Sequence, residues 1–188
     1  MEFGKLAPEK VRKNVVLASL YITAFDLLEM SIKKETKDFL TFMYLDDPEK
    51  AEQEYKKEVS DKYPFENRYG RKYYDDYRAC VLWLRDINAI KGSSEVDALL
   101  KIRDHRNDIV HELPKLLLDE KFELDFSLFQ ELQRLHKKIM IFWARMKVID
   151  VNPEYDGKEI KDEEIEPASV LFLEYILSTF VSKPTENR

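Results

Sequence analysis

The sequence predicts an all-α fold, a helical bundle of four to six helices, and three observations support this prediction. The 188 residues include only four glycines and seven prolines but 36% charged residues, a balance that favours long helices over turn-rich sheets. Hydrophobic residues make up 44% of the chain, which is enough for a packed core. Several segments carry apolar residues at intervals of three and four positions. The length fits a single helical domain spanning residues 1–188.

Three helices are predicted in the first half of the chain. The segment from Pro8 to about Tyr44 contains no glycine and no proline after Pro8 itself. Its middle is apolar on most sides. We therefore expect one long helix packed against several neighbours. A charged, peripheral helix is expected after Pro48. Residues 64–70 are expected to form a turn or loop, and the segment from Tyr74 to Ile87 carries apolar side chains at helical spacing.

The next helix is expected to be capped by residues 92–94 and to run to Pro114. Because proline has no N–H to donate to the carbonyl of Val110, we expect this helix to kink or end one turn after His111. The brief alternation of apolar residues at 122–126 is compatible with a short extended piece.

A fourth core helix is predicted to begin with a capping box at Ser127 and Gln130. The core bundle then covers about 8–149. An acidic loop at about 150–166 leads to an apolar C-terminal helix at about 167–183. This last helix has more apolar surface than one buried stripe needs, so we expect it to close the core or to contact a second subunit.

Charge and cysteine content limit the function classes. The formal net charge of −6 excludes a diffuse attraction to nucleic acid, so any RNA contact must rest on a few local cations. Cys80, the single cysteine, excludes an internal disulfide and is expected to be an inert buried thiol. We expect a cytoplasmic protein with no membrane partner, because no secretory signal is evident and Asp26 and Glu29 interrupt the most apolar helix.

The helix that precedes Pro114 carries polar groups on an otherwise apolar side. Aliphatic residues between 99 and 117 gather on one side of it, and Arg106 lies in the middle of that side. Asn107 and His111 are four positions apart and lie on its border. A guanidinium in such a place must be paired, reach water or face a partner's site, because burying it unpaired costs several kcal/mol.

The segment Arg106–His111 reads R-N-x-x-x-H and resembles the Arg-x4-6-His signature of the HEPN superfamily, in which a polar residue commonly follows the arginine. The resemblance extends in outline over the bundle from about Val11 to Ile149. It implies a helical-bundle domain that dimerises so that the motifs of two subunits meet in one cleft. Many HEPN proteins are metal-independent endoribonucleases, and several act as toxins or antiviral effectors.

Carried onto this chain, the resemblance implies catalytic Arg106 and His111 and orienting Asn107. Asp26 and Arg103 are candidate supporting residues beside them. It also implies a homodimer, an RNA substrate, no metal or other cofactor, and an antitoxin protein as a further partner. In one toxin branch a tyrosine two places beyond the histidine is modified by a nucleotidyltransferase antitoxin. Leu113 stands at that place here, so the resemblance does not extend to this route of regulation.

The residue types suit RNA cleavage. When a 2′-hydroxyl attacks the adjacent phosphorus, the reaction needs a proton acceptor, a donor for the departing 5′-oxygen and positive charge near the phosphorane. An imidazole with a pKa near ~6.5 exchanges protons near neutrality, and a guanidinium binds two phosphate oxygens at once. A two-fold axis would double the single Arg106–His111 pair, giving one histidine as base and the other as acid.

Other residues carry weaker signals. Arg68, Arg71 and Lys72 stand among tyrosines and are candidate RNA contacts, although tyrosines entering a core helix beside a charged turn would look the same. His105 and His136 lack the spacing of metal ligands and are expected to be solvated, so no metal site is predicted.

Two alternatives to an enzyme stay open. HEPN proteins that have lost catalysis act as binding or scaffold modules, so the chain can also be interpreted as a module that binds a nucleotide or a protein within a toxin–antitoxin pair. In a purely structural bundle, Arg106 would only pair with a carboxylate such as Asp26.

Overall fold

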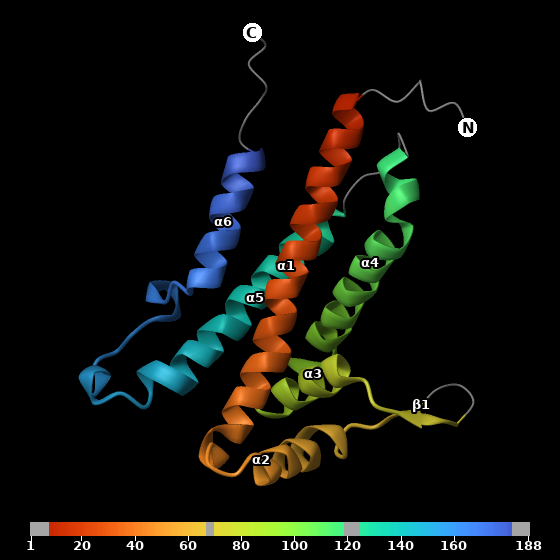
Figure 1. Cartoon of the computed structure of the whole chain (residues 1–188). Helices are drawn as coiled ribbons and strands as arrows, with labels where there is room; N and C mark the ends of the chain where they lie inside the picture. The colour runs from red at the N-terminus through yellow and green to blue at the C-terminus, as the bar shows by residue number, and fades with distance from the viewer. Residues whose placement is uncertain (1–7, 67–69, 119–124, 182–188) are drawn as a thin grey trace.

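Helix α1 (Pro8–Thr41) lies in the middle of the bundle and contacts every other α-helix (Figure 1). The computed structural model describes residues 8–66, 70–118 and 125–181. In this part of the chain, five more α-helices follow: α2 (Pro48–Tyr55), α3 (Asp76–Asp86), α4 (Gly92–Leu118), α5 (Phe126–Ala144) and α6 (Ala168–Val181). The prediction of an all-α bundle of four to six helices is therefore confirmed.

Short elements extend or connect these helices. Two π-helical turns, η2 (Lys56–Ser60) and η3 (Arg145–Ile149), continue α2 and α5, and three 3-10 turns are η1 (Phe42–Tyr44), η4 (Pro153–Tyr155) and η5 (Asp162–Glu164). Strands β1 (Phe65–Glu66) and β2 (Lys72–Tyr73) form a two-residue antiparallel pair.

The prediction of a loop at 64–70 was wrong for the two residues of β1. Phe65 lies opposite Tyr73 in the strand pair, and the centroids of their rings are 5.6 Å apart. The guanidinium of Arg78 lies 4.9 Å from the centroid of the Phe65 ring. These ring contacts hold together two segments that have no helical periodicity of their own.

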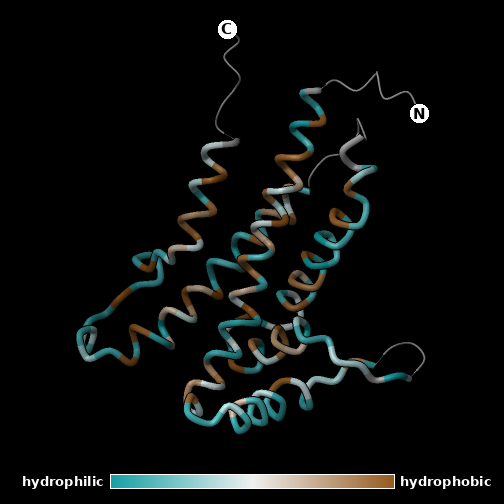
Figure 2. The backbone as a smooth tube through the Cα atoms, viewed as in Figure 1, coloured by the Kyte–Doolittle hydropathy of each residue, from teal (hydrophilic) through white to brown (hydrophobic). Residues whose placement is uncertain are grey.

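The core follows the apolar side of α1. Buried residues of α1 recur at intervals of one helical turn and pack against α3, α4 and α5: Ala18, Tyr21, Phe25, Leu28 and Ile32. Figure 2 shows hydrophobic segments on α3, α4 and α5, whereas α2 is largely hydrophilic. The narrow polar stripe of Ser19, Thr23 and Asp26 is exposed, as its spacing predicts. The indole N–H of Trp143 on α5 donates to the carbonyl of Ser31, 2.7 Å away, and ties α5 to α1.

Helix α1 also meets the length and hydropathy of a membrane span. Asp26 and Glu29 lie on this helix but do not exclude a membrane span by length and composition. In the bundle, 44% of its most apolar stretch is buried against other parts of the chain. The central helix of a protein core can be equally long and apolar, so the predicted cytoplasmic location stays a prediction.

Aspartates cap three of the helices. The side chains of Asp47, Asp75 and Asp125 accept hydrogen bonds from backbone N–H groups in the first turns of α2, α3 and α5. The predicted capping box at Ser127 was therefore wrong by two residues, because Ser127 instead donates its hydroxyl to Asp125, 2.6 Å away. Similarly, α3 begins at Asp76, so Tyr74 precedes that helix rather than lying on it.

The structure defines both ends of α4. The helix begins at Gly92, whose φ of 62° favours a residue without a Cβ atom, and the carboxylate of Glu95 accepts from the backbone N–H of Lys91. Pro114 does not end the helix, which continues to Leu118. Val110, whose carbonyl loses its helical donor, is exposed, so water can take the donor's place at little cost.

Candidate functional site

Arg106 lies where α4 packs against α1. Its guanidinium carbon is 5.5 Å from the centroid of the Phe25 ring, and its side chain is 29% exposed. One terminal nitrogen donates to Oδ1 of Asn107 at 3.3 Å, and the other lies 3.5 Å from Oδ1 of Asp26. Its Nε is buried and has no hydrogen-bond partner among the described residues. The arginine is thus only loosely held, and one of its donors is unsatisfied.

The contact between Arg106 and Asp26 is the ion pair that we expected if the chain is a purely structural bundle. The Asp26 side chain is 53% exposed, and a separation of 3.5 Å in a partly solvated setting contributes little to stability. The ion pair therefore positions the guanidinium without burying it. Asp26 therefore brings a partly exposed carboxylate beside the arginine.

His111 stands apart from Arg106 on the surface of α4. It is exposed, whereas Asn107 is half-buried. Five residues on an α-helix correspond to a rotation of about 140°, so Arg106 and His111 point to different sides of the same helix. One chain therefore does not bring the two predicted catalytic side chains to a common point.

Arg103 connects α4 to the start of α3. It donates to Oδ2 of Asp75 at 2.7 Å, while Oδ1 of the same carboxylate caps α3, and its guanidinium lies over the ring of Tyr77. These contacts hold the start of α3 against α4. Arg103 therefore supports the position of α4 and is less free than Arg106 to meet a ligand.

The two other histidines are not solvated, contrary to prediction. His105 is half-buried with its ring edge-to-face against Tyr21, at 4.9 Å between centroids, and burial lowers its pKa. His136 is only 1% exposed, and burial lowers its pKa to about 4. Its Nε2 lies 3.2 Å from the hydroxyl of Ser169 on α6. The prediction for His136 was wrong because α6 covers the face of α5 that carries this residue. The polar residues beside His136 in the sequence gave no sign of that cover.

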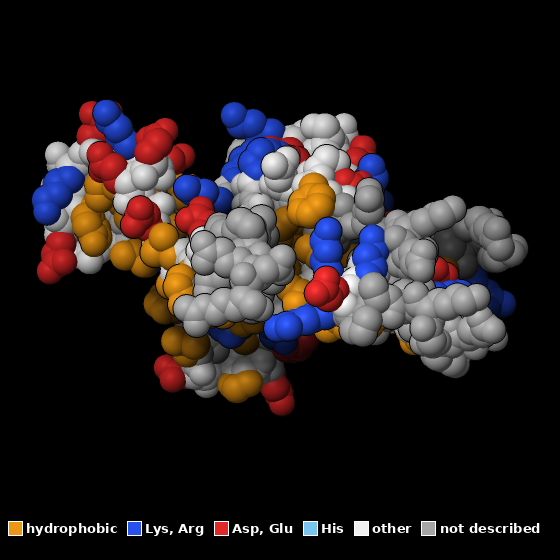
Figure 3. Space-filling model, turned by 90° about the horizontal axis from the view of Figure 1, so that it is seen from above, with side chains coloured by type: hydrophobic (Ala, Val, Ile, Leu, Met, Phe, Trp, Pro, Cys, Tyr) orange, Lys and Arg blue, Asp and Glu red, His pale blue; other side chains and the backbone are white. Residues whose placement is uncertain are grey.

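The candidate RNA contacts near the strand pair are described only in part. Arg68 lies outside the described residues, Arg71 is exposed, and the backbone of Lys72 belongs to β2. Tyr73 and Tyr74 are each about half exposed, which leaves aromatic surface beside Arg71. Seen from the end of the bundle near both termini, described cationic, anionic and apolar side chains alternate (Figure 3). The described residues on that face form no extended basic surface.

Cys80 is buried in the core, and burial raises the pKa of its thiol to about 12. The predicted burial of this thiol is thus confirmed. Among the described residues, no group of three or more histidine, cysteine or acidic side chains is placed to hold a metal ion.

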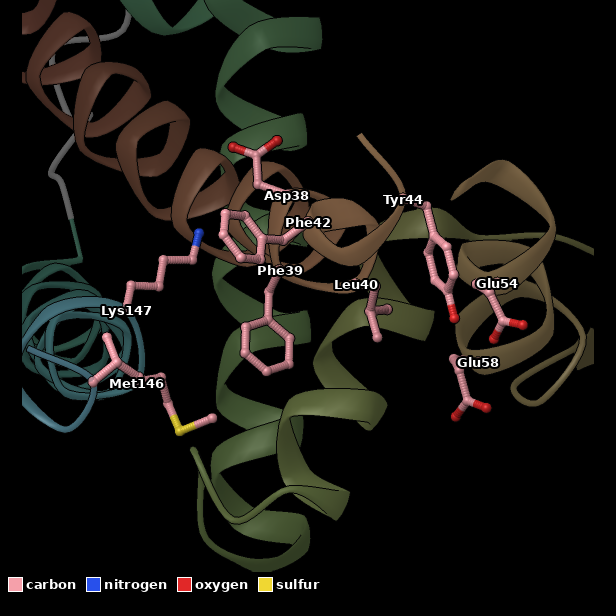
Figure 4. Close-up of a pocket in the computed structure, with 10 residues that line it drawn as sticks. Asp38, Phe39, Leu40, Phe42, Tyr44, Glu54, Glu58, Met146 and Lys147 are labelled. Atoms are coloured by element: carbon pink, nitrogen blue, oxygen red, sulfur yellow. The ribbon is translucent and has the colours of Figure 1, made fainter. Parts of the chain in front are cut away.

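A large cavity lies at the other end of α1, away from the motif. This α1-end cavity has a volume of about 810 Å³ and lies between the end of α1, the π-helical turn of α2 and the turn that follows α5. Its lining includes Phe39, Leu40, Phe42, Met146, Glu54 and Glu58 (Figure 4). None of Arg106, Asn107 and His111 lines it.

Comparisons with protein-family models, curated proteins and solved structures found no match to this chain.

The sequence analysis did not identify the α1-end cavity. A partial signal for it was the apolar group Phe39, Leu40 and Phe42 at the end of a long helix, immediately before the Asp46–Pro48 helix start. The remaining walls come from residues about 15 and more than 100 positions later, and no local pattern connects them.

Proposed function

We propose that the chain is a metal-independent endoribonuclease of the HEPN type, in which Arg106 binds the scissile phosphate and His111 exchanges protons with the substrate. One observation carries the proposal. The guanidinium of Arg106 remains partly exposed, and its buried Nε has no partner within the described part of the chain. Its 3.5 Å contact with Asp26 leaves it able to turn toward a phosphate. The exposed His111 lies five residues further along the same helix.

The proposed reaction is an internal transfer at phosphorus. The 2′-oxygen forms a bond to phosphorus as a base removes its proton, and the bond from phosphorus to the 5′-oxygen breaks as an acid protonates that oxygen. The products are a 2′,3′-cyclic phosphate and a 5′-hydroxyl end. Arg106 stabilises the charge on the phosphorane, and no redox partner or added nucleophile is needed.

A second copy of the chain completes the proposed site. The rotation of about 140° between Arg106 and His111 prevents one α4 helix from presenting both groups to one phosphate without help. A two-fold axis beside α4 would bring two arginines and two histidines together, with one histidine as base and one as acid. Light scattering at micromolar concentration should therefore give twice the chain mass of 22.5 kDa. A monomer that cleaves RNA would contradict the shared site.

Incubation of the protein with mixed RNA in EDTA tests the chemistry. Wild-type protein should release fragments that end in a 2′,3′-cyclic phosphate. Arg106→Ala should abolish most of this activity, and Arg106→Lys should restore only part of it, because lysine keeps the charge but cannot bind two phosphate oxygens. Glu112→Ala, an exposed change beside His111, is the matched control and should cleave as wild type does. New 3′-hydroxyl ends created at the cleavage position would contradict the proposed reaction.

A non-catalytic binding module is the second candidate, and one observation favours it. Arg106 already contacts Asp26, Asn107 and Phe25 within its own chain, as a structural arginine would. In that case wild type and Arg106→Ala should be equally inactive on RNA in EDTA, and Asp26→Ala should destabilise the fold as much as Arg106→Ala does.

A further inference from the structure

An exposed tyrosine ring stands on the strand pair, which projects from the side of the bundle (Figure 1). The ring of Tyr73 on β2 lies 5.6 Å from that of Phe65 on β1, and the guanidinium of Arg78 lies 4.9 Å from the other ring, that of Phe65. The side chain of Tyr73 is nevertheless 46% exposed. Its neighbours thus hold the ring while about half of its surface faces water. A flat ring held in this way offers a stacking surface to a second planar group.

The strand pair is connected to the surroundings of Arg106 through Asp75. Tyr73 precedes Asp75 by two residues, a span of at most about 7 Å. Asp75 accepts a hydrogen bond of 2.7 Å from Arg103, which lies about one helical turn before Arg106 on α4. His111 lies on the other side of Arg106 along the same helix. An RNA strand whose phosphate is bound by Arg106 can therefore extend along α4 in one direction to His111 and in the other toward Tyr73.

Charge attraction does not explain RNA binding at the strand pair. The carboxylates of Asp75 and Asp76 already contact cations, at 2.7 and 3.3 Å. Glu66 on β1 and Asp104 on α4 are exposed, and the chain as a whole carries a formal net charge of −6. A strand of RNA that lies here must therefore gain from the aromatic ring itself. The planar, uncharged unit that RNA offers to such a ring is the nucleobase.

We propose that Tyr73 is a base-stacking residue of the RNA site, and that its ring lies against an unpaired base while Arg106 binds a phosphate of the same strand. The inference rests on the proposed function, which supplies RNA as the ligand. Bases within a duplex are already stacked on one another, so only an unpaired base can make this contact. Stacking on an aromatic side chain tolerates every base, so Tyr73 fixes the position of the strand and does not read its sequence.

An RNA analogue that cannot be cleaved separates binding from chemistry. A short fluorescein-labelled strand of mixed sequence carries 2′-O-methyl groups throughout, so its 2′-oxygens have no proton to lose and cannot attack phosphorus. Fluorescence anisotropy with the full chain gives the dissociation constant for this strand and for its duplex with a complementary strand. We expect wild type to bind the single strand more tightly than the duplex, because only the single strand reaches the Tyr73 ring with a base.

Two variants and one control connect this binding to Tyr73. Tyr73→Leu keeps an apolar contact with Phe65 but removes the flat ring. It should weaken single-strand binding about tenfold, or about 1.4 kcal/mol, which is in the usual range for one stacked base, and leave duplex binding unchanged. Tyr73→Phe keeps the ring and should bind the single strand as wild type does. Tyr175→Leu, which removes a 70% exposed tyrosine from α6, is the matched control and should also bind as wild type does.

Salt dependence separates stacking on a base from contact with a phosphate. On single strands, each neutralised phosphate contributes a slope of about 0.7 to the plot of log affinity against log salt concentration. Arg106→Ala should therefore reduce the slope by about 0.7. Tyr73→Leu should leave the slope unchanged although it weakens binding, because no phosphate contact is lost.

Four results would overturn the inference. These are a wild-type protein that does not bind the single strand, equal single-strand affinity of wild type and Tyr73→Leu, equal losses of single-strand and duplex binding in that variant, and a Tyr73→Phe protein that binds as weakly as Tyr73→Leu. Failure of the ribonuclease proposal gives a different result, since RNA would then be bound with the expected dependence on Tyr73 but would stay intact in EDTA. If RNA is cleaved in EDTA and the Tyr73 variants bind as wild type does, only the stacking inference is wrong.

Discussion

His111 and His136 lie on neighbouring helices among polar residues in the sequence, yet their environments are opposite. His111 on α4 is exposed, whereas His136 on α5 is buried beneath α6 and bonded to Ser169. His136 is 1% exposed, and burial lowers its pKa, so its imidazole is neutral at pH 7 and is shielded from solvent. His111 keeps its access to solvent. The position of a covering helix, rather than the residue type, thus decides which imidazole is available for chemistry.

Alanine substitution should produce the largest difference between these two regions. His136→Ala leaves a cavity under α6 and removes the bond to Ser169, so it should cost about 3 kcal/mol. For a domain of this size that corresponds to a fall in melting temperature of roughly 6–12 °C. His111→Ala, at an exposed position, should cost less than about 0.5 kcal/mol. Differential scanning calorimetry of the two variants checks this, and equal shifts would contradict the difference in burial.

The pH dependence of stability should show a smaller effect of His136. Its pKa is about 4 in the folded protein and ~6.5 when unfolded, so the unfolded chain takes up the proton first as the pH falls. Stability from this group is complete above pH 6.5 and is lost as the pH falls toward 4. Between pH 7 and pH 5 the loss should be about 2 kcal/mol.

The control for this pH effect is His136→Gln, which does not titrate. Urea unfolding of both proteins at pH 7, 6 and 5 isolates the contribution of His136, because the other titrating groups are common to both. Wild type should lose about 2 kcal/mol more than the variant over this range. Parallel pH profiles would indicate that His136 takes up its proton equally readily in the folded and the unfolded chain, which would contradict its burial.

The smallest effect is expected for the ion pair between Arg106 and Asp26. With a separation of 3.5 Å and a half-exposed carboxylate, the pair should contribute a coupling energy below about 0.5 kcal/mol. A double-mutant cycle with Arg106→Ala, Asp26→Ala and the combined variant measures it by urea unfolding. A coupling above about 1 kcal/mol would make Arg106 a structural arginine and favour the non-catalytic module.

The parts of the fold that could be predicted are those with local signals. The uninterrupted segment after Pro8, the Asp47–Pro48 start and the proline before α6 each predicted an element that the structure contains. The cap of α5 was misplaced because Asp125 and Ser127 are both good capping residues two positions apart. Only the folded backbone decides between them.

The parts that could not be predicted depend on contacts between distant segments. The burial of His136 depends on α6, which begins 32 residues later, and the α1-end cavity needs walls from three separate regions. For the motif, helical periodicity correctly placed Arg106 against other helices. The sequence offered Asp26 as one candidate partner of Arg106, but it could not select that contact or predict the one with Phe25, because both depend on how α1 and α4 cross.

The most direct test of the proposed ribonuclease is a comparison of wild type and His111→Ala on the same RNA in EDTA, with the melting temperature of each protein measured in the same buffer. We predict a cleavage rate at least about 100-fold lower for the variant, the usual loss when a general acid or base is removed. The two melting temperatures should agree within about 2 °C, since an exposed side chain is replaced. Equal rates, or a preparation of wild-type dimer that leaves the RNA intact, would contradict the assignment of His111 as the group that exchanges protons.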